Sequence, residues 1–583
     1  MGEPIRYPRI TARLRLFSPP VLSLPLALTL AISLLLSSAA LAQESTEAQD
    51  NPAAIASAHP LATEAGRQVL AVGGNAFDAA IAVAAALGVV EPAGSGMGGG
   101  GFWLLHRAED GYQTMLDARE RAPGRASADM YLDDNGDVVR GHALNGPTAA
   151  AIPGQAAAFA HLAEHYGNLP LSLSLAPAIQ LAEEGFPVGE RYRMLAGFRE
   201  SVMRDFTPTR EIFLYEGEIP PLGHVIRQPD LARVLVQLGR EGHAGFYEGP
   251  LAEQLVRAVR AAGGIWELQD LADYQVVERE PLVSHFRGAR IVSAPPPSSG
   301  GIVLAQIFNM LAEFNDGDIS PALLPHLTVE AMRRAYYDRA VHLGDPDFVD
   351  IPVQQLLSEA HARELASSIR LDKATPSADL GDPVDQPEGT HTTHFSILDA
   401  EGNRVAATLS INLPFGSGFT VPGTGILLNN EMDDFSAHPG APNAYGLVGS
   451  HANAIAPGKR PLSSMTPTFV EWDDQVAILG TPGGSRIITM VLLGIQQALA
   501  GEPVGDWVSA PRYHHQYLPD VVQVEPEVMD SPLAKELEVR GHTLESVGRR
   551  YGDMQAIHWH RESDTVSAAS DPRGEGDSVT ASP

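Results

Sequence analysis

Hydrophobic positions follow two different periods along this chain, and the change between them divides it. In the front part, apolar residues recur three or four positions apart, which is the spacing of a helix face. The pattern predicts helices over 59–72 and 75–87, a β-hairpin over 102–117 and mainly helical layers over 154–370. Asn75 has a side chain suited to cap the second helix, and Pro92 stops that helix.

After Thr392 the apolar positions alternate with a period of two, which is typical of strands. The alternation predicts strands over 393–398 and 404–412, a second hairpin over 468–479, and then a long apolar helix over 486–499. Two hairpins that feed a buried helix predict an α/β fold in which sheets are covered by helices, a four-layer αββα sandwich. The polar end of the chain, 575–583, is expected to fray.

A run of glycines between the second helix and the first hairpin contains the spacing G-x-G-x-x-G, at Gly94, Gly96 and Gly99. A dinucleotide site needs a strand before this motif and a helix after it. Here a helix precedes the run and a strand follows it, so the order is the reverse. The glycines instead indicate that backbone segments, or backbone and a ligand, pass close to one another.

The N-terminus resembles a targeting segment. Four arginines within the first 15 residues precede an apolar run over 26–36 and the small residues of 40–42. This order is typical of a secretory signal peptide over 1–42, with cleavage before Gln43. An uncleaved membrane anchor is the alternative, although the run is shorter than the roughly 20 residues that a span needs. With no later apolar run of that length, we expect a periplasmic or secreted protein with no stable membrane span after signal removal.

Composition excludes several classes of function. The chain has no cysteine, so disulfides, thiolate catalysis and cysteine-ligated metals are excluded. It has 71 acidic and 40 basic residues, a formal net charge of −31, and without residues 1–42 the charge becomes −34. Nucleic acids bind through Lys and Arg that neutralise phosphates, so a nucleic-acid partner is not expected. The excess acid is most simply a means of solvation.

Thr392 is the candidate nucleophile. A threonine hydroxyl needs an adjacent base, and its own α-amino group becomes one if the bond between His391 and Thr392 is cut. If the hairpin is symmetric about Glu401, Thr392 lies opposite Ser410, with Cβ atoms about 5 Å apart. Asn412 then points to the same face. The alternative is that these three side chains belong to an ordinary polar sheet face.

Several long motifs favour the nucleophile over an ordinary polar sheet face. They are 392–396 (TTHFS), 425–436 (GILLNNEMDDFS), 459–465 (KRPLSSM), 481–486 (TPGGSR), 98–102 and 117–123. In this order they resemble the γ-glutamyltranspeptidase family across nearly the whole chain. The resemblance implies a fold of the N-terminal-nucleophile hydrolase type, made by a precursor that cuts itself before Thr392. The products would be a large subunit, 43–391, and a small subunit, 392–583, which form a heterodimer.

The resemblance also implies roles for individual residues. Thr392 would form an ester with a γ-glutamyl group, and the backbone N–H groups of Gly483 and Gly484 would form the oxyanion hole. The remaining candidates bind the substrate: Arg119, Ser463 and Ser464 hold its carboxylate, Asn412, Glu431 and Asp434 hold its ammonium group, and Tyr445 closes over it from a lid at 437–461. The alternatives are that Arg119 forms an ordinary surface ion pair with a neighbouring acid, and that the lid is a static surface loop. Asp433 is expected to be structural.

One position departs from the family's pattern. Ser410 stands where members usually carry threonine, so the hydroxyl is kept, but the methyl group that fixes its rotamer is lost. Slower self-processing is therefore expected at this site. Adjacent His514 and His515 suggest a metal site, but neighbouring residues on a strand point in opposite directions. No cofactor and no metal are expected.

The resemblance implies glutathione and other γ-glutamyl compounds as donors, with water or amino acids and peptides as acceptors. An acylase of the same superfamily, which removes glutaryl-like groups from β-lactam side chains, is the nearest alternative. Such an enzyme would not need groups that bind an ammonium. A non-catalytic binding protein that keeps the fold without maturing is a third possibility.

Overall fold

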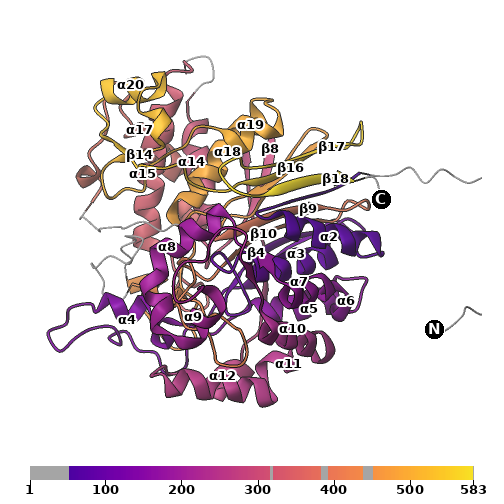
Figure 1. The fold of residues 1–583 in the computed structure, drawn as a ribbon. Coiled ribbons are helices and arrows are strands. Elements are labelled where there is room, and N and C mark those ends of the chain that lie inside the picture. Colours follow the sequence, from indigo (N-terminus) through magenta and orange to yellow (C-terminus); the bar gives the residue numbers. More distant parts are fainter. Residues whose placement is uncertain (1–51, 315–319, 382–391, 437–450, 582–583) are drawn as a thin grey trace, which may run out of the picture. The chain divides into compact units, whose positions relative to one another are not determined.

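The computed structural model describes residues 52–314, 320–381, 392–436 and 451–581. Asn51–Pro583 forms one compact unit, and within it two antiparallel sheets pack face to face between two layers of helices (Figure 1). This arrangement confirms the four-layer α/β fold predicted from the sequence. In the described part of the chain, no helix is long and apolar enough to cross a membrane.

The first sheet mixes strands from both sides of Thr392. Its seven strands lie in the order β18 (Asp577–Ala581), β1 (Ala53–Ser57), β9 (Thr393–Leu398), β10 (Arg404–Ser410), β2 (Gly100–Arg107), β3 (Tyr112–Ala118) and β6 (Val277–Arg279). All neighbours are antiparallel. Strand β9 therefore pairs with β1 from the front part of the chain on one edge, and with β10 on the other.

The second sheet has six antiparallel strands. Their order is β17 (Thr565–Ser570), β16 (Gln555–His560), β12 (Gln475–Gly480), β11 (Thr468–Trp472), β8 (Ala289–Ser293) and β7 (Leu282–Phe286). Two smaller sheets are formed by β13 (Tyr513–His514), β14 (Val522–Val524) and β15 (Leu544–Ser546), and by β4 (Phe186–Pro187) and β5 (Val225–Ile226).

Each large sheet is covered by its own helices, which lie on opposite sides of the sheet pair in Figure 1. The first sheet packs against α2 (Pro60–Ala71), α3 (Ala76–Val90), α5 (Gln155–His165), α7 (Ala176–Glu184) and α10 (Pro229–Glu241). The second packs against α14 (Gly300–Ala312), α15 (Leu324–His342), α18 (Ile487–Leu499) and α19 (Val504–Ser509). The remaining α-helices are α4 (Arg140–Leu144), α6 (Leu171–Ser174), α8 (Glu190–Asp205), α9 (Thr207–Phe213), α11 (Ala244–Tyr247), α12 (Gly249–Ala261), α13 (Leu268–Ala272), α16 (Val353–Leu356), α17 (Glu359–Ser367) and α20 (Pro532–Val539).

Helix α3 shows how the local sequence produces the layer. Asn75 accepts hydrogen bonds from two N–H groups of the first turn, and the carboxylate of Asp78 accepts one from the backbone N–H of Asn75. This reciprocal capping box fixes the start of the helix. Nearly every side chain of α3 is buried, as expected for a helix that is apolar on all sides. The helix ends at Val90, three residues beyond the predicted end.

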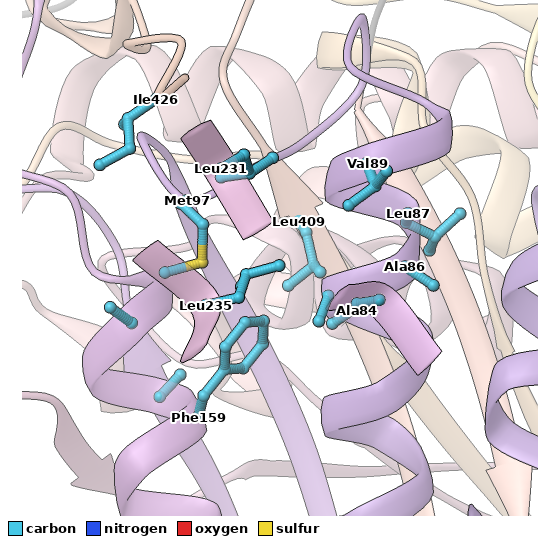
Figure 2. Packing of buried hydrophobic residues seen from close by; sticks show 14 of the residues in the cluster. Ala84, Ala86, Leu87, Val89, Met97, Phe159, Leu231, Leu235, Leu409 and Ile426 are labelled. Atoms are coloured by element: carbon cyan, nitrogen blue, oxygen red, sulfur yellow. The ribbon is translucent and has the colours of Figure 1, made fainter. Parts of the chain in front are cut away.

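The register of β9 and β10 sets the position of the candidate nucleophile. Thr393 pairs with Leu409, which is the register predicted from a turn centred on Glu401. Leu409 packs into the helical core among Ala84, Leu235 and Phe159 (Figure 2). Since successive side chains of a strand alternate between faces, Ser410 points away from that core, toward the second sheet.

One expectation about secondary structure is wrong. Residues 577–581 do not fray: β18 pairs with β1 over five residues, because edge-strand pairing depends on backbone hydrogen bonds and tolerates polar side chains. The region over 154–370 is mainly helical, as predicted, and it also contains the strands β4 to β8. Strands β7 and β8 form a hairpin, whereas β6 and β8 also pair with strands far away in the sequence, β3 and β11.

The glycine run provides close approach of backbones, as predicted. A Cβ atom on Gly98 would overlap the carbonyl oxygen of Leu427, and one on Gly99 would overlap that of Ser410. The glycine run therefore allows the end of β10 and the 425–436 segment to pack closely against it. It belongs to the scaffold of the candidate site.

Candidate active site

A small cavity at the end of β10 brings most of the predicted residues together. Eight of them line it: Arg119, Thr392, Ser410, Asn412, Asp434, Ser463, Ser464 and Gly484. Glu431 lies behind the wall and contacts Arg119, while Gly483 faces a neighbouring cavity. His391, Tyr445 and the proposed signal peptide over 1–42 lie outside the described residues.

Thr392 directly precedes β9 and is buried. The ladder ends at the pair Thr393 and Leu409, and Thr392 and Ser410 are the next positions in the same register. The Oγ of Ser410 accepts a hydrogen bond of 2.7 Å from the backbone N–H of Asn412. A hydroxyl that accepts one bond keeps its own hydrogen, so Ser410 can still donate to a neighbouring oxygen.

Asn412 is held in an uncommon backbone conformation. Its φ is +72°, a left-handed value that asparagine tolerates better than most residues. Its side-chain Nδ2 donates to the carbonyl oxygen of Asn430 over 2.9 Å. The amide oxygen therefore remains to accept a hydrogen bond from a ligand in the cavity.

Arg119 is the centre of charge in the cavity. It follows the end of β3, its side chain is only 1% exposed, and three carboxylates surround it. Nη2 lies 2.5 Å from Asp434, and Nη1 lies 2.9 Å from Glu431 and 3.6 Å from Glu120. Its burial excludes an ordinary surface ion pair for Arg119, which was the alternative interpretation.

The protonation of this cluster follows from burial and charge. Burial by itself would lower the pKa of Arg119, but the three carboxylates outweigh it and hold that pKa above its ordinary value. Burial raises the pKa of Glu431 well above its usual range, and raises that of Glu120 to about 8. The cluster therefore holds protons at neutral pH, and a second cation entering it would displace them.

The serine pair lines the same cavity and is backed by a second arginine. The Oγ of Ser464 accepts a hydrogen bond of 3.1 Å from Nη2 of Arg339, a buried residue of α15. Nε of Arg339 donates to Ser299 over 2.8 Å, and burial lowers the pKa of Arg339 to about 10. Arg339 was missed by the sequence analysis, because an arginine within a helix gives no local signal that it faces a site.

The loop before α18 provides the candidate oxyanion donors. Gly483 has a φ of +143° and Gly484 a φ of +59°, and a 3-10 turn over Gly484–Arg486 leads into the helix. Within the described residues, neither N–H group donates a hydrogen bond. Unpaired N–H groups at the start of a helix favour an anion.

The adjacent histidines are packing residues. The Nδ1 of His514 lies 2.8 Å from the Oγ1 of Thr489, and Nε2 of His515 lies 3.3 Å from Asp520. Burial lowers the pKa of both rings, to about 4 for His515, so both are neutral at physiological pH. Across the described ranges, no group of three or more histidines and acids is placed to hold a metal ion.

A model of the gamma-glutamyltranspeptidase family matches residues 62–581. The chain belongs to the γ-glutamyltranspeptidase family. It is 41% identical over 529 residues to a glutathione hydrolase proenzyme of Escherichia coli (strain K12), covering 90% of each chain. It is also 36% identical over 527 residues to an acylase ACY 1 proenzyme of Pseudomonas sp. (strain SE83), covering 88% of this chain and 90% of the other.

The fold of this γ-glutamyltranspeptidase family member is shared by solved structures. A crystal structure of cephalosporin acylase from Bacillus halodurans superimposes with a TM-score of 0.79 at 30% identity, covering 91% of this chain and 96% of that one. This likeness confirms the N-terminal-nucleophile hydrolase fold. Both glutathione hydrolases and acylases are similar to this protein over most of its chain. The charges in the cavity are therefore the features that distinguish the two activities.

Proposed function

We propose that this protein is a self-processing γ-glutamyltransferase and glutathione hydrolase. The observation that carries the proposal is the pairing of Arg119 with Asp434 in the cavity that Thr392 lines. A γ-glutamyl group ends in an α-carboxylate and an α-ammonium, which are the charges complementary to these two side chains. When such a substrate binds, the ion pair between Arg119 and Asp434 is replaced by two ion pairs with the substrate. Arg119 then pairs with the carboxylate of the substrate, and Asp434 pairs with its ammonium group.

Maturation comes first in the proposed sequence of events. The hydroxyl of Thr392 attacks the carbonyl carbon of His391, the peptide C–N bond breaks, and an ester forms that water hydrolyses. The large subunit, 43–391, then ends in a carboxylate, and the small subunit, 392–583, begins with a free amine. Removal of residues 1–42 in a periplasmic or secretory pathway completes the proposed processing.

Turnover uses the new amine as a base. Its reference pKa is roughly 8, so it accepts the hydroxyl proton of Thr392 near neutral pH. The oxygen attacks the γ-carbonyl, and the N–H groups of Gly483 and Gly484 stabilise the negative charge that develops. The C–N bond breaks as the ammonium returns its proton to the leaving amine, which leaves a γ-glutamyl ester on Thr392. Water or an acceptor amine then attacks the ester, and its proton returns to the Thr392 oxygen.

The charges of the cavity favour γ-glutamyl donors over glutaryl ones. A glutaryl group would compete with Asp434 for Arg119 without bringing a cation for the displaced carboxylate. A buried carboxylate left unpaired is strongly unfavourable.

The test combines processing with turnover. Denaturing electrophoresis should show two bands for the wild type and one for Thr392→Ala, and mass spectrometry should find a fragment that begins at Thr392. The wild type should release the dye from a chromogenic γ-glutamyl anilide. One uncut band with no release of dye would refute the proposal and favour a non-catalytic protein.

The acylase activity is the second candidate, because the likeness to the cephalosporin acylase covers most of the chain. Glutaryl anilide has the same scissile bond as the γ-glutamyl compound and lacks the ammonium group. We expect the γ-glutamyl anilide to be the better substrate by roughly 100-fold in kcat/KM, the scale set by charge-assisted hydrogen bonds of about 1.5–3 kcal/mol. Faster hydrolysis of the glutaryl compound would establish the acylase instead.

A further inference from the structure

A second cavity shares the oxyanion loop with the active site. Its volume is about 250 Å³, and Gly483 lines it, whereas Gly484 lines the cavity of Thr392. Helix α8 forms one wall, and the segment over 549–552 forms another. We call it the Arg549 cavity. Any molecule bound there lies against Gly483, one of the two residues proposed to stabilise the reacting carbonyl.

The walls of the Arg549 cavity are strongly basic in a chain whose net charge is −31. Five arginines line it, and the described lining includes no acidic residue: Arg191, Arg486, Arg549, Arg550 and Arg573. A concentration of one charge sign in a cavity attracts ligands of the other sign. The acidic surface elsewhere makes this concentration a local property of the cavity.

Three of these arginines contact acidic side chains that lie behind the cavity wall. Arg573 contacts both oxygens of Glu525, at 2.6 and 2.7 Å, and Arg550 forms an ion pair with Glu527. Arg191 lies 3.3 Å from Asp553 and 3.5 Å from Glu91. Their charges are therefore largely used within the protein.

Arg549 differs from these three. It forms no ion pair with a carboxylate of the described residues, and its guanidinium lies over the ring of Phe198, 5.3 Å from the centroid. Nearby, Nε of Arg486 donates to Oε1 of Gln523 over 2.9 Å. Burial, and to a lesser extent repulsion from Arg549, lower the pKa of Arg486 to about 10. An anion bound by Arg549 would offset that repulsion.

The cavity also offers apolar surface beside this charge. Met194 is 49% exposed and Phe198 is 55% exposed, although both are large apolar side chains. Both belong to α8 and line the same cavity as Arg549. The geometry therefore suits a ligand that carries a carboxylate next to an apolar side chain, as the C-terminus of a peptide does. A planar guanidinium can hold such a carboxylate with two parallel hydrogen bonds.

We propose that the Arg549 cavity is the acceptor subsite, in which Arg549 binds the carboxylate of the amino acid or peptide that receives the acyl group. This inference rests on the proposed transferase function. The peptide released from glutathione also ends in a carboxylate, so the same cavity would hold the leaving group before it departs. Arg549 thus contributes to specificity for the acceptor, while Arg119 contributes to specificity for the γ-glutamyl donor.

The experiment compares glycylphenylalanine with its C-terminal amide as acceptors, with γ-glutamyl anilide as donor. The wild type should prefer the free carboxylate at least tenfold in kcat/KM. In Arg549→Gln this preference should fall about tenfold, which corresponds to about 1.4 kcal/mol. Arg550→Gln removes the same charge from the rim, where Glu527 neutralises it, and should change the preference less than twofold. An unchanged preference in Arg549→Gln, or no preference in the wild type, would overturn the proposal.

Calorimetric binding of the same two probes gives an answer that does not depend on turnover. Glycylphenylalanine should bind the wild-type protein more tightly than the amide, and Arg549→Gln should abolish the difference. Equal binding of both probes to the wild type would refute the subsite. Release of dye from the anilide without any acceptor tests the proposed function separately, so the two failures are distinguishable.

Discussion

Nη2 of Arg119 lies 2.5 Å from Oδ2 of Asp434, inside the cavity that Thr392 lines. The two side chains satisfy each other without substrate, although the proposed substrate has a partner for each of them. With Glu431 and Glu120, which also lie close to Arg119, Asp434 balances a buried cation that would be strongly destabilising if it were left alone. It also means that donor affinity reflects an exchange of partners, and both members of the pair contribute to it.

Replacement of Asp434 tests that exchange. In Asp434→Asn, the proposed ammonium site loses its charge, and KM for γ-glutamyl anilide should rise roughly 10- to 100-fold, the range of a charge-assisted hydrogen bond. Glutaryl anilide, which has no ammonium group, should lose far less. Electrophoresis of the variant should still show two bands, because self-cleavage does not use this group. An unchanged KM for the γ-glutamyl compound would contradict the assignment.

Ser410 should control the rate of maturation. Its Oγ accepts from the N–H of Asn412 and lies at the register position opposite Thr392. Ser410→Ala removes the hydroxyl, and we expect precursor cleavage to slow at least tenfold in a time course followed on gels. Ser410→Thr keeps the hydroxyl and restricts its rotamer, so it should cleave at least as fast as the wild type. Slower cleavage in the threonine variant would show that the methyl group does not fit here.

Gly483 should tolerate no side chain. At a φ of +143° an L-residue is strained, and a Cβ atom would lie 2.5 Å from Cε of Met490. Gly483→Ala should therefore displace the oxyanion loop and lower kcat by roughly 100- to 1000-fold, the cost of losing one such donor. Gly501→Ala is the control, since Gly501 also has a positive φ, +83°, but lies in open space after α18. It should lower Tm without lowering kcat.

Asp553 should make stability depend on pH. Burial raises the pKa of its carboxyl from 3.8 to about 7. The folded protein therefore retains a proton that the unfolded chain releases, and its free energy of unfolding falls as pH rises across that window. The slope from this group is about 1.4 kcal/mol per pH unit. Asp553→Asn cannot ionise and should lack this component, whereas Asp134→Asn, in an exposed loop, should keep the wild-type slope. Parallel curves for wild type and Asp553→Asn in chemical unfolding would contradict the shifted pKa.

The sequence predicted the elements that depend on local signals. The capped start of α3 and both hairpins near the site follow from side-chain period and turn residues, and the Thr393–Leu409 pairing follows from the symmetry of one turn. Strands whose partners are far away gave weaker signals. Strand β8 pairs with β11 about 180 residues later, and the polar strand β18 pairs with β1 at the other end of the chain.

The candidate site shows the same division between local and distant information. Its residues were found through motifs, and the structure gathers eight of them in one cavity. The direct contact of Arg119 with Asp434, and the position of Arg339 behind Ser464, depend on how distant segments pack. Neither relationship has a counterpart in spacing along the chain, because the partners are 315 and 125 residues apart.

The place of β9 between β1 and β10 has a consequence for the life of the protein after the proposed scission. Two polypeptides whose strands interdigitate in one sheet cannot drift apart unless that sheet is dismantled. After denaturation, however, the two subunits would have to associate again from solution, whereas the uncut precursor carries both halves in one polypeptide. The protein would then fold efficiently only once, as the precursor. The lifetime of the mature dimer would depend on how slowly it unfolds rather than on how readily it reassembles.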